Sequence, residues 1–279
     1  MMYKEGKWAK QLLAMQKADG SWGWFHSLSQ MSDMPVTTEQ ALRRLEGLGF
    51  TAEDECIRRA VDYMTDCLCG RCVIPDRAEK VSDWQVVSSL FLATWLRRFV
   101  PDHPQALQVA QRWAEVVTRA FAGGEYDQRR YVQAYKEVLK PKYGRINGVM
   151  TFYPVSLMSD CLDAQTEKLF AAYAISHPQG IYYLYDNPLC ELPKRFESRE
   201  TLRYLAAVEL LTRYPAARPM LAFVKEWLYR NRNVEDRWDL GSKANDKMFL
   251  PLSDDWRKKE NRIADCTAYV ERLLAQLEQ

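Results

Sequence analysis

The chain has 279 residues, a formal net charge of +2, 47% hydrophobic residues and 27% charged residues. These proportions are typical of a globular protein that folds in water. The small net charge, spread over intermixed basic and acidic residues, argues against a nucleic-acid ligand and against an anionic membrane surface.

The sequence carries no signal for export or for membrane insertion. Its first residues, MMYKEGKWAKQLLAMQK, have an amphipathic helical pattern without the long apolar core of a secretory signal. The longest strongly apolar run, Val86 to Leu96, is too short to span a bilayer and is closed by two arginines. Seven cysteines, an odd number, favour reduced thiols. We therefore predict a cytoplasmic protein with no membrane span.

Apolar residues recur with helical spacing along the whole chain, as in the run from Ala106 to Ala120. Helix-start signals agree with these runs: Thr37 to Gln40 and Ser82 to Gln85 have the pattern of capping boxes, and Pro104 suits a first helical turn. Ile181 to Tyr185 is the one plausible short strand. The predicted helices cover residues 6–16, 36–49, 53–68, 82–99, 104–121, 126–139, 152–158, 161–176, 198–213, 216–230 and 259–277.

Two classes of helix alternate in this series. Residues 82–99 and 198–213 are apolar around most of the helix, as expected for helices buried on both sides. Residues 53–68, 104–121 and 216–230 keep one charged face, as expected for an outer layer. The alternation predicts a repeat of helical hairpins.

A turn near the start of the chain carries the most specific motif. Gln16, Gly20 and Trp22 have the spacing Gln-x3-Gly-x-Trp. Glycine permits a tight turn, and the glutamine amide can reach backbone groups of a neighbouring helix. The spacing resembles the QW motif of squalene-hopene cyclase-like terpene cyclases, which occurs more loosely in protein prenyltransferase β subunits. The alternative is a surface turn that carries a tryptophan.

Weaker copies of this arrangement follow. Trp227 to Leu274 repeats the order of Leu12 to Leu45, with Asp236 and Trp238 in its turn. Gly180-x-Tyr182 stands in a similar place between two predicted helices. Together the copies resemble the α/α toroid shared by terpene cyclases and prenyltransferase β subunits. The resemblance implies one all-α domain over residues 1–279, with about 11–12 helices in alternating inner and outer layers. An open α-solenoid or a plain helical bundle is the alternative fold.

In such a toroid the inner helices would begin at one mouth of a central cavity, where their dipoles gather partial positive charge. The high aromatic content, 12%, favours an aromatic-lined interior. Helix capping is the alternative role for the polar residues at these positions. The cavity candidates are Trp24, His26, Asp83, Trp84, Tyr153, Asp160, Arg195, Asp254, Asp255 and Trp256.

Catalytic motifs of the resembled families are not retained. The Asp-x-Asp-Asp acid of class II terpene cyclases is absent, and Asp254-Asp255 is only a pair. The zinc of prenyltransferases would need an Asp, a Cys and a His; Asp160, Cys161 and His177 offer the right atoms without a distinctive spacing.

Cys56, Cys67, Cys69 and Cys72 form the sharpest local cluster of cysteines. Thiolates at such spacing can complete a tetrahedral zinc site, so zinc is a possible cofactor. The alternative is that Cys56 and Cys67, eleven residues apart on a predicted helix, serve as small buried hydrophobic side chains.

We expect a protein that is non-catalytic or degenerate relative to terpene cyclases, that binds a small-molecule or lipid-like ligand in a central aromatic-lined cavity, and that has no cofactor. A non-catalytic scaffold would instead have a ring centre filled by side chains. One alternative is an enzyme that acts on an isoprenoid or another lipid, which requires a deep apolar pocket. The other is a glycan lyase or hydrolase on the same scaffold, which requires an open polar cleft with paired carboxylates or a Tyr-Arg-His set.

Overall fold

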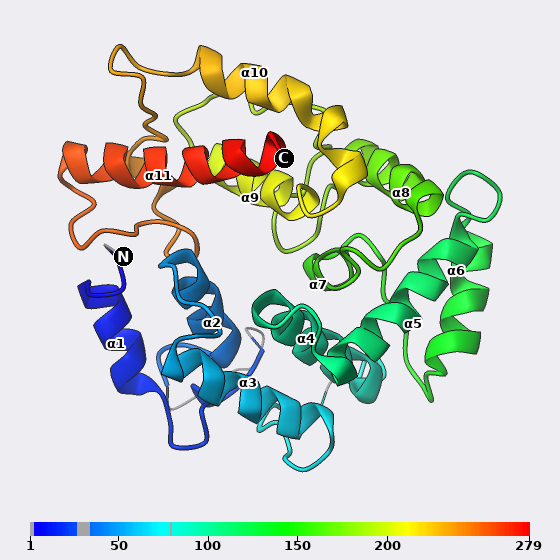
Figure 1. Cartoon of the computed structure of the whole chain (residues 1–279). Helices are drawn as coiled ribbons and strands as arrows, with labels where there is room; N and C mark the ends of the chain where they lie inside the picture. The colour runs from blue at the N-terminus through cyan, green and yellow to red at the C-terminus, as the bar shows by residue number, and fades with distance from the viewer. Residues whose placement is uncertain (1–2, 27–33, 79) are drawn as a thin grey trace. The chain divides into compact units, whose positions relative to one another are not determined.

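The structure is a computed structural model that describes residues 3–26, 34–78 and 80–279. Over these residues the chain is helical and contains no strand, which confirms the predicted all-α class (Figure 1). Each predicted helix is present. The helices are α1 (Lys7–Met15), α2 (Thr38–Gly47), α3 (Glu55–Leu68), α4 (Trp84–Phe99), α5 (Pro104–Ala120), α6 (Gln128–Ala134), α7 (Phe152–Leu157), α8 (Ala164–Ser176), α9 (Arg199–Leu211), α10 (Ala222–Arg230) and α11 (Lys259–Leu277).

Several boundaries differ from the predictions for local reasons. The capping box of Thr37 and Gln40 is confirmed, whereas α4 is capped by Asp83 instead of Ser82. The predicted helix 216–230 begins as two short 3-10 turns, Pro215–Ala217 and Pro219–Leu221, because each proline lacks the N–H of a helical hydrogen bond. The helix predicted to end at residue 139 continues from α6 as a π-helical turn, Tyr135–Leu139; a further 3-10 turn is Ser242–Ala244.

The strand predicted for Ile181 to Tyr185 does not form. Ile181 and Tyr185 make one isolated antiparallel bridge with each other, and Tyr182 makes an isolated parallel bridge with Thr151. Tyr183 has a φ of +75°, a left-handed conformation that turns the chain and prevents an extended run.

The chain divides into two compact units. Unit 1 comprises Met1–Arg112 and Leu139–Asn147, and unit 2 comprises Trp113–Val138 and Gly148–Gln279. A closed toroid in a single domain, 1–279, concerns how these units join and stays a prediction. No helix in the described part of the chain is long and apolar enough to cross a membrane.

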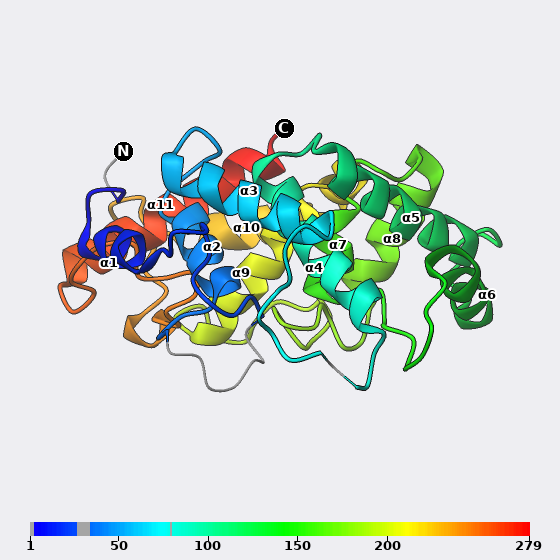
Figure 2. The same cartoon turned by 90° about the horizontal axis from the view of Figure 1, so that it is seen from below.

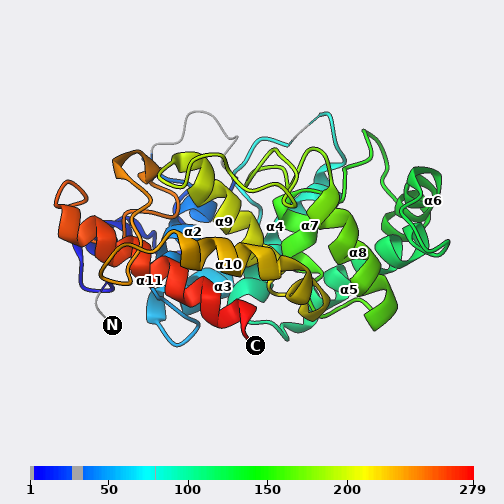
Figure 3. The ribbon, with the colours of Figure 1, turned by 90° about the horizontal axis from the view of Figure 1, so that it is seen from above.

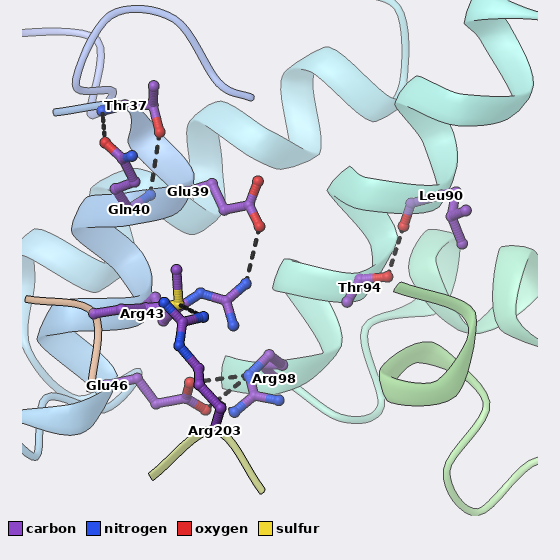
Figure 4. A network of polar contacts seen from close by, with 10 residues as sticks. Thr37, Glu39, Gln40, Arg43, Glu46, Leu90, Thr94, Arg98 and Arg203 are labelled. Carbon is purple, nitrogen blue, oxygen red and sulfur yellow. Dashed lines mark hydrogen bonds and ion pairs between the residues drawn. The ribbon is translucent and has the colours of Figure 1, made fainter. Parts of the chain in front are cut away.

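Unit 1 is organised around α4, which is buried on nearly every side as its sequence predicts. Figure 2 shows α3 beside α4, against which it packs. Figure 4 shows charged residues that join α2 to α4: Glu46 accepts hydrogen bonds from Nε and Nη2 of Arg98, at 2.9 and 2.7 Å. The guanidinium groups of Arg43 and Arg98 both lie over the ring of Trp95, at 5.1 and 5.6 Å.

Unit 2 is organised around α9, which is likewise buried along most of its length. α7 and α11 both contact α9, and α10 runs beside α11 (Figure 3). The two helices that the sequence singles out as apolar all round are therefore each the core helix of one unit.

The turn of Gln16, Gly20 and Trp22 fastens α1 to α3 in unit 1. The Gln16 amide donates to the carbonyls of Gly20 and of Cys56 in the first turn of α3, at 2.9 and 2.7 Å. The indole of Trp22 donates to the Leu12 carbonyl at 2.7 Å and so satisfies a carbonyl in the last turn of α1. The expectation that the glutamine reaches a neighbouring helix is confirmed.

A matching turn joins α10 to the following loop in unit 2. The indole of Trp238 donates to the carbonyl of Leu228, in the last turn of α10, at 2.7 Å. Gly180-x-Tyr182 does not form a third such turn, because the Tyr182 side chain is 56% exposed. We call residues 16–22 and 232–238 the tryptophan turns of unit 1 and unit 2.

Candidate functional site

A polar groove of about 630 Å³ lies in unit 1. Its walls are the C-terminal end of α3 (residues 67–70), one face of α4, one face of α5, and the segment 139–142. A volume of this size suits a small molecule. No described residue that lines the groove is aromatic, so it is not the aromatic-lined cavity that the sequence predicts.

Two helical stripes face each other across this groove. On α4 the stripe consists of Gln85, Ser88, Ser89 and Leu92, beside which Val86 also lines the groove, and on α5 it consists of Gln105, Gln108, Val109 and Arg112. Each set follows the spacing i, i+3, i+4, i+7, which places its members on one face of a helix. The two faces thus present amides and hydroxyls toward the groove, together with the apolar side chains of Leu92 and Val109.

The charges along the groove are mostly positive. Arg112, Lys140 and Lys142 line it, and Asp83 is the one carboxylate among the described lining residues. Lys140 directly follows the π-helical turn and has a φ of +52°. A left-handed lysine is an unusual backbone state, and such states are frequent at binding sites.

The Asp83 carboxylate is already occupied by backbone donors. Its Oδ1 accepts the N–H groups of Gln85 and Val86 at 3.1 and 3.2 Å, and its Oδ2 accepts the N–H of Lys142 at 2.7 Å. Burial raises the pKa of Asp83, but these N–H donors outweigh burial and hold the pKa below its usual value. Asp83 therefore stays ionised and caps α4, and it is unsuited to act as a general acid.

The hydroxyls of the α4 stripe are also partly used. Ser89 donates to the Gln85 carbonyl at 2.7 Å, and Ser88 donates to the same carbonyl at 3.4 Å. Their oxygens keep lone pairs that can accept from a ligand. Together with the side-chain amides of Gln105 and Gln108, the groove can bind a ligand that carries hydroxyl groups and negative charge.

Among the predicted cavity residues of unit 1, Asp83 alone lines the groove. His26 and Trp84 instead contact the ring of Phe91, at centroid distances of 5.6 and 5.9 Å. The backbone N–H of His26 donates to Asp76 at 2.7 Å, so this segment is held in place from a distant part of the sequence. Trp24 is half-buried, and its carbonyl accepts the N–H of Thr38.

The candidates from the first part of unit 2 have separate environments. Tyr153 is buried against Tyr183, with ring centroids 5.7 Å apart. Asp160 is exposed and has a φ of +69°, in the turn that precedes α8. Arg195 is exposed, and its carbonyl accepts hydrogen bonds that help to start α9.

The candidates before α11 mainly shape the loop that leads to this helix. Trp256 is buried, and its indole donates to the Ser242 carbonyl at 3.0 Å. Asp255 accepts the N–H of Arg257, and Asp254 is exposed. Asp255 therefore closes a turn in this loop, whereas α11 itself begins without a side-chain cap.

The four clustered cysteines do not come together. Cys56 and Cys67 are eleven residues apart on α3, which corresponds to about 16 Å along the helix axis. A zinc–sulfur bond is about 2.3 Å, so Cys56 cannot share an ion with Cys67, Cys69 and Cys72. Across the described residues no group of three or more His, Cys, Asp and Glu side chains is placed to hold a metal ion.

Most of the groove residues are not among those predicted from the sequence. The stripes of α4 and α5 are visible as polar positions at helical spacing, and Lys140-Pro-Lys142 stands out as a short basic segment after a helix. These signals would have suggested three polar surfaces, but nothing in the sequence indicates that they face one another.

No protein-family model matches this chain, and no match is found among curated proteins or among solved structures. The chemistry of the groove therefore rests on its own residues: a polar pocket with three cationic side chains and one carboxylate that is fully engaged.

Proposed function

We propose that this is a ligand-binding protein and that the groove of unit 1 holds a small polar anion, a phosphate or carboxylate compound with hydroxyl groups. The observation that carries the proposal is the pairing of two facing polar stripes with Arg112, Lys140 and Lys142 in one groove of about 630 Å³. Cationic side chains bind phosphate and carboxylate groups through charge-assisted hydrogen bonds, which are roughly twice as strong as neutral ones.

Binding without catalysis is the simplest role for this groove. Its carboxylate, Asp83, already accepts three backbone hydrogen bonds, and no described lining residue is a histidine. A general acid or base needs a titratable group within reach of the ligand and with a pKa near the working pH. The other titratable side chains in the lining are Lys140, Lys142, Cys67 and Cys69. Burial raises the pKa of Cys67 to about 11, which keeps it protonated near neutral pH. We therefore propose that the lysines serve recognition.

The polar lining favours a hydrophilic ligand over an isoprenoid. A lipid would leave the amides of Gln85, Gln105 and Gln108 buried without partners, at a cost of roughly 1–3 kcal/mol for each group. The central aromatic-lined cavity, and a lipid or glycan enzyme built on it, stay predictions about how the two units join.

The proposal is tested by calorimetric titration with citrate, pyrophosphate and a sugar phosphate at low and at physiological salt. We expect at least one of them to bind with a millimolar or lower dissociation constant. The double variant Lys140→Ala/Lys142→Ala should weaken that binding by about tenfold or more, and added salt should weaken it further.

Lys168→Ala is the matched control, because Lys168 is an exposed lysine on α8 of unit 2. It should leave the affinity unchanged. The proposal is wrong if none of the three anions binds, or if the double variant binds as tightly as the parent protein.

A further inference from the structure

The chain folds back on itself directly after α3, in a turn that contains Cys69 and Cys72 and follows Cys67 in the last turn of the helix. The N–H groups of Arg71 and Cys72 both donate to the Asp66 carbonyl, at 2.8 and 3.2 Å. Gly70 has a φ of +74°, a left-handed state that permits this reversal at the end of a helix. Cys72 is thereby held against the last turn of α3, next to the residue that precedes Cys67.

The thiols in this turn differ in their exposure. Cys69 and Cys72 are exposed, whereas Cys67 is half-buried. Burial raises the pKa of Cys67 to about 11, and the negative charge of an ionised Cys72 adds to the rise. The backbone bond from Cys72 to Asp66 places Cys72 beside the last turn of α3, which contains Cys67.

We propose that Cys67 and Cys72 form a thiol–disulfide modification site, in which a low-molecular-weight disulfide such as glutathione disulfide oxidises the two thiols to a Cys67–Cys72 disulfide. In the first step the Cys72 thiolate attacks one sulfur of the glutathione disulfide. The sulfur–sulfur bond breaks, one glutathione thiolate leaves, and Cys72 carries the other glutathione as a mixed disulfide.

In the second step the Cys67 thiolate attacks the sulfur of Cys72. The mixed disulfide breaks, the second glutathione leaves, and the Cys67–Cys72 bond forms. Two protein thiols are oxidised and one disulfide is reduced to two thiols, and the two protons lost by the protein end on the two glutathione molecules. This scheme assigns the accessible thiol as the entry point and the half-buried thiol as the resolving group.

The order of steps follows from accessibility and ionisation. A bulky disulfide reaches the exposed Cys72 more easily than Cys67. The thiolate is the attacking species, and most Cys67 is protonated at neutral pH. Closure of the internal disulfide should therefore become about tenfold faster for each unit by which the pH rises, until the pH approaches 11. The mixed disulfide should therefore accumulate near pH 7 and be consumed faster near pH 9.

The test is incubation of the full chain with glutathione disulfide, followed by intact mass spectrometry and peptide mapping. We expect a Cys67–Cys72 cross-link that is two hydrogen masses lighter than the reduced chain. Cys67→Ser should stop at one glutathione on Cys72, and Cys72→Ser should give no cross-link to Cys67. Cys67→Ala repeats the first variant with an apolar side chain, and circular dichroism verifies that each variant is folded.

Cys69→Ser is the control and should behave as the parent chain, and the exposed Cys190 of unit 2 reports ordinary surface reactivity. A cross-link between Cys69 and Cys72 would overturn the proposal. It would also be overturned if Cys72 reacts no faster than Cys190 and no internal disulfide forms at pH 9.

Discussion

The two tryptophan turns use the same hydrogen bonds with different side chains around them. In each turn the indole donates at 2.7 Å to the carbonyl of a leucine ten residues earlier. The backbone N–H of each tryptophan donates to a threonine hydroxyl of a later helix, Thr38 at 2.9 Å and Thr267 at 3.1 Å. The tryptophan and its two partners are thus the shared part of the device.

What differs is the contact with a neighbouring helix. In unit 1, a Cβ on Gly20 would lie 2.2 Å from the Arg59 carbonyl oxygen of α3, so that only glycine fits. In unit 2, the matching position is Asp236, which is exposed and has a φ of +57°. The close approach of α3 therefore requires glycine in the turn of unit 1. The turn itself needs only a residue with a left-handed backbone conformation.

The largest effect should come from Gly20→Ala. The left-handed φ and the clash with backbone atoms of α3 should together lower the free energy of unfolding by about 3 kcal/mol. Asp236→Gly, the matched change in unit 2, should alter it by less than about 1 kcal/mol. Urea unfolding followed by circular dichroism measures both, and equal effects would break the distinction between the turns.

A second test addresses the shared hydrogen bond. Trp22→Phe and Trp238→Phe each remove a buried indole N–H and part of a ring, which should cost about 2 kcal/mol in each unit. Similar losses are expected because both indoles satisfy a carbonyl in the last turn of a helix. Trp8→Phe, at a half-buried position, is the control; a loss confined to one unit would show that the turns are not equivalent.

A smaller difference is expected at the first position of each turn. Gln16→Ala removes two hydrogen bonds that connect α1 to α3 and should cost about 1–2 kcal/mol. Arg232→Ala removes an exposed ion pair with Asp236 and contacts with the rings of Tyr229 and Trp238, and should cost less than about 0.5 kcal/mol. Thermal unfolding of both variants measures this difference in stability. A loss of stability in Arg232→Ala as large as that in Gln16→Ala would contradict the prediction.

The smallest expected effect is a dependence of the stability on pH that arises next to the tryptophan turn of unit 2. Burial raises the pKa of Asp239, but hydrogen bonds from Arg262 and from the Gly241 N–H outweigh burial and lower the pKa overall. The ionised Asp239 therefore contributes stability at any pH above its unfolded-state pKa of about 3.9. This contribution is lost as the pH falls through the lower pKa of the folded state.

We expect less than about 1 kcal/mol from this pair, because it is partly exposed. Asp239→Asn should remove that share of the acid sensitivity between about pH 4 and pH 2, measured by urea unfolding at a series of pH values. In unit 1 the position that matches Asp239 is Gly23, which has no carboxylate. The turn of unit 1 should therefore not contribute to the acid sensitivity. An unchanged pH profile in Asp239→Asn would contradict the assignment.

The helices could be predicted from the sequence because their signals are local. The apolar spacing of α5 and the paired caps of Thr37 and Gln40 involve residues within one or two turns of each other. The boundary at Ser82 was wrong because Asp83 competes for the same N–H groups with a shorter path. The tryptophan turns were recognisable for the same reason, since the indole bond of each spans ten residues, whereas their threonine partners lie 16 and 29 residues away.

The groove could not be predicted because it depends on which surfaces meet. Lys142 is brought to Asp83 by a backbone hydrogen bond across fifty-nine residues, which no local pattern encodes. The predicted cavity residues were chosen for their place before helices, and in the structure they serve as caps, as loop anchors or as exposed side chains. Among these residues Asp83 alone caps a helix, and Asp83 is also the one that lines the groove.

The indole N–H groups of Trp22 and Trp238 provide a built-in reporter in each compact unit. Both are buried and hydrogen-bonded to carbonyl oxygens, so their protons should exchange with deuterated solvent only when the surrounding unit opens. Two resolved indole signals in a nuclear magnetic resonance spectrum would then give two opening rates. Equal rates would mean that the units open together, and unequal rates would show which unit opens first.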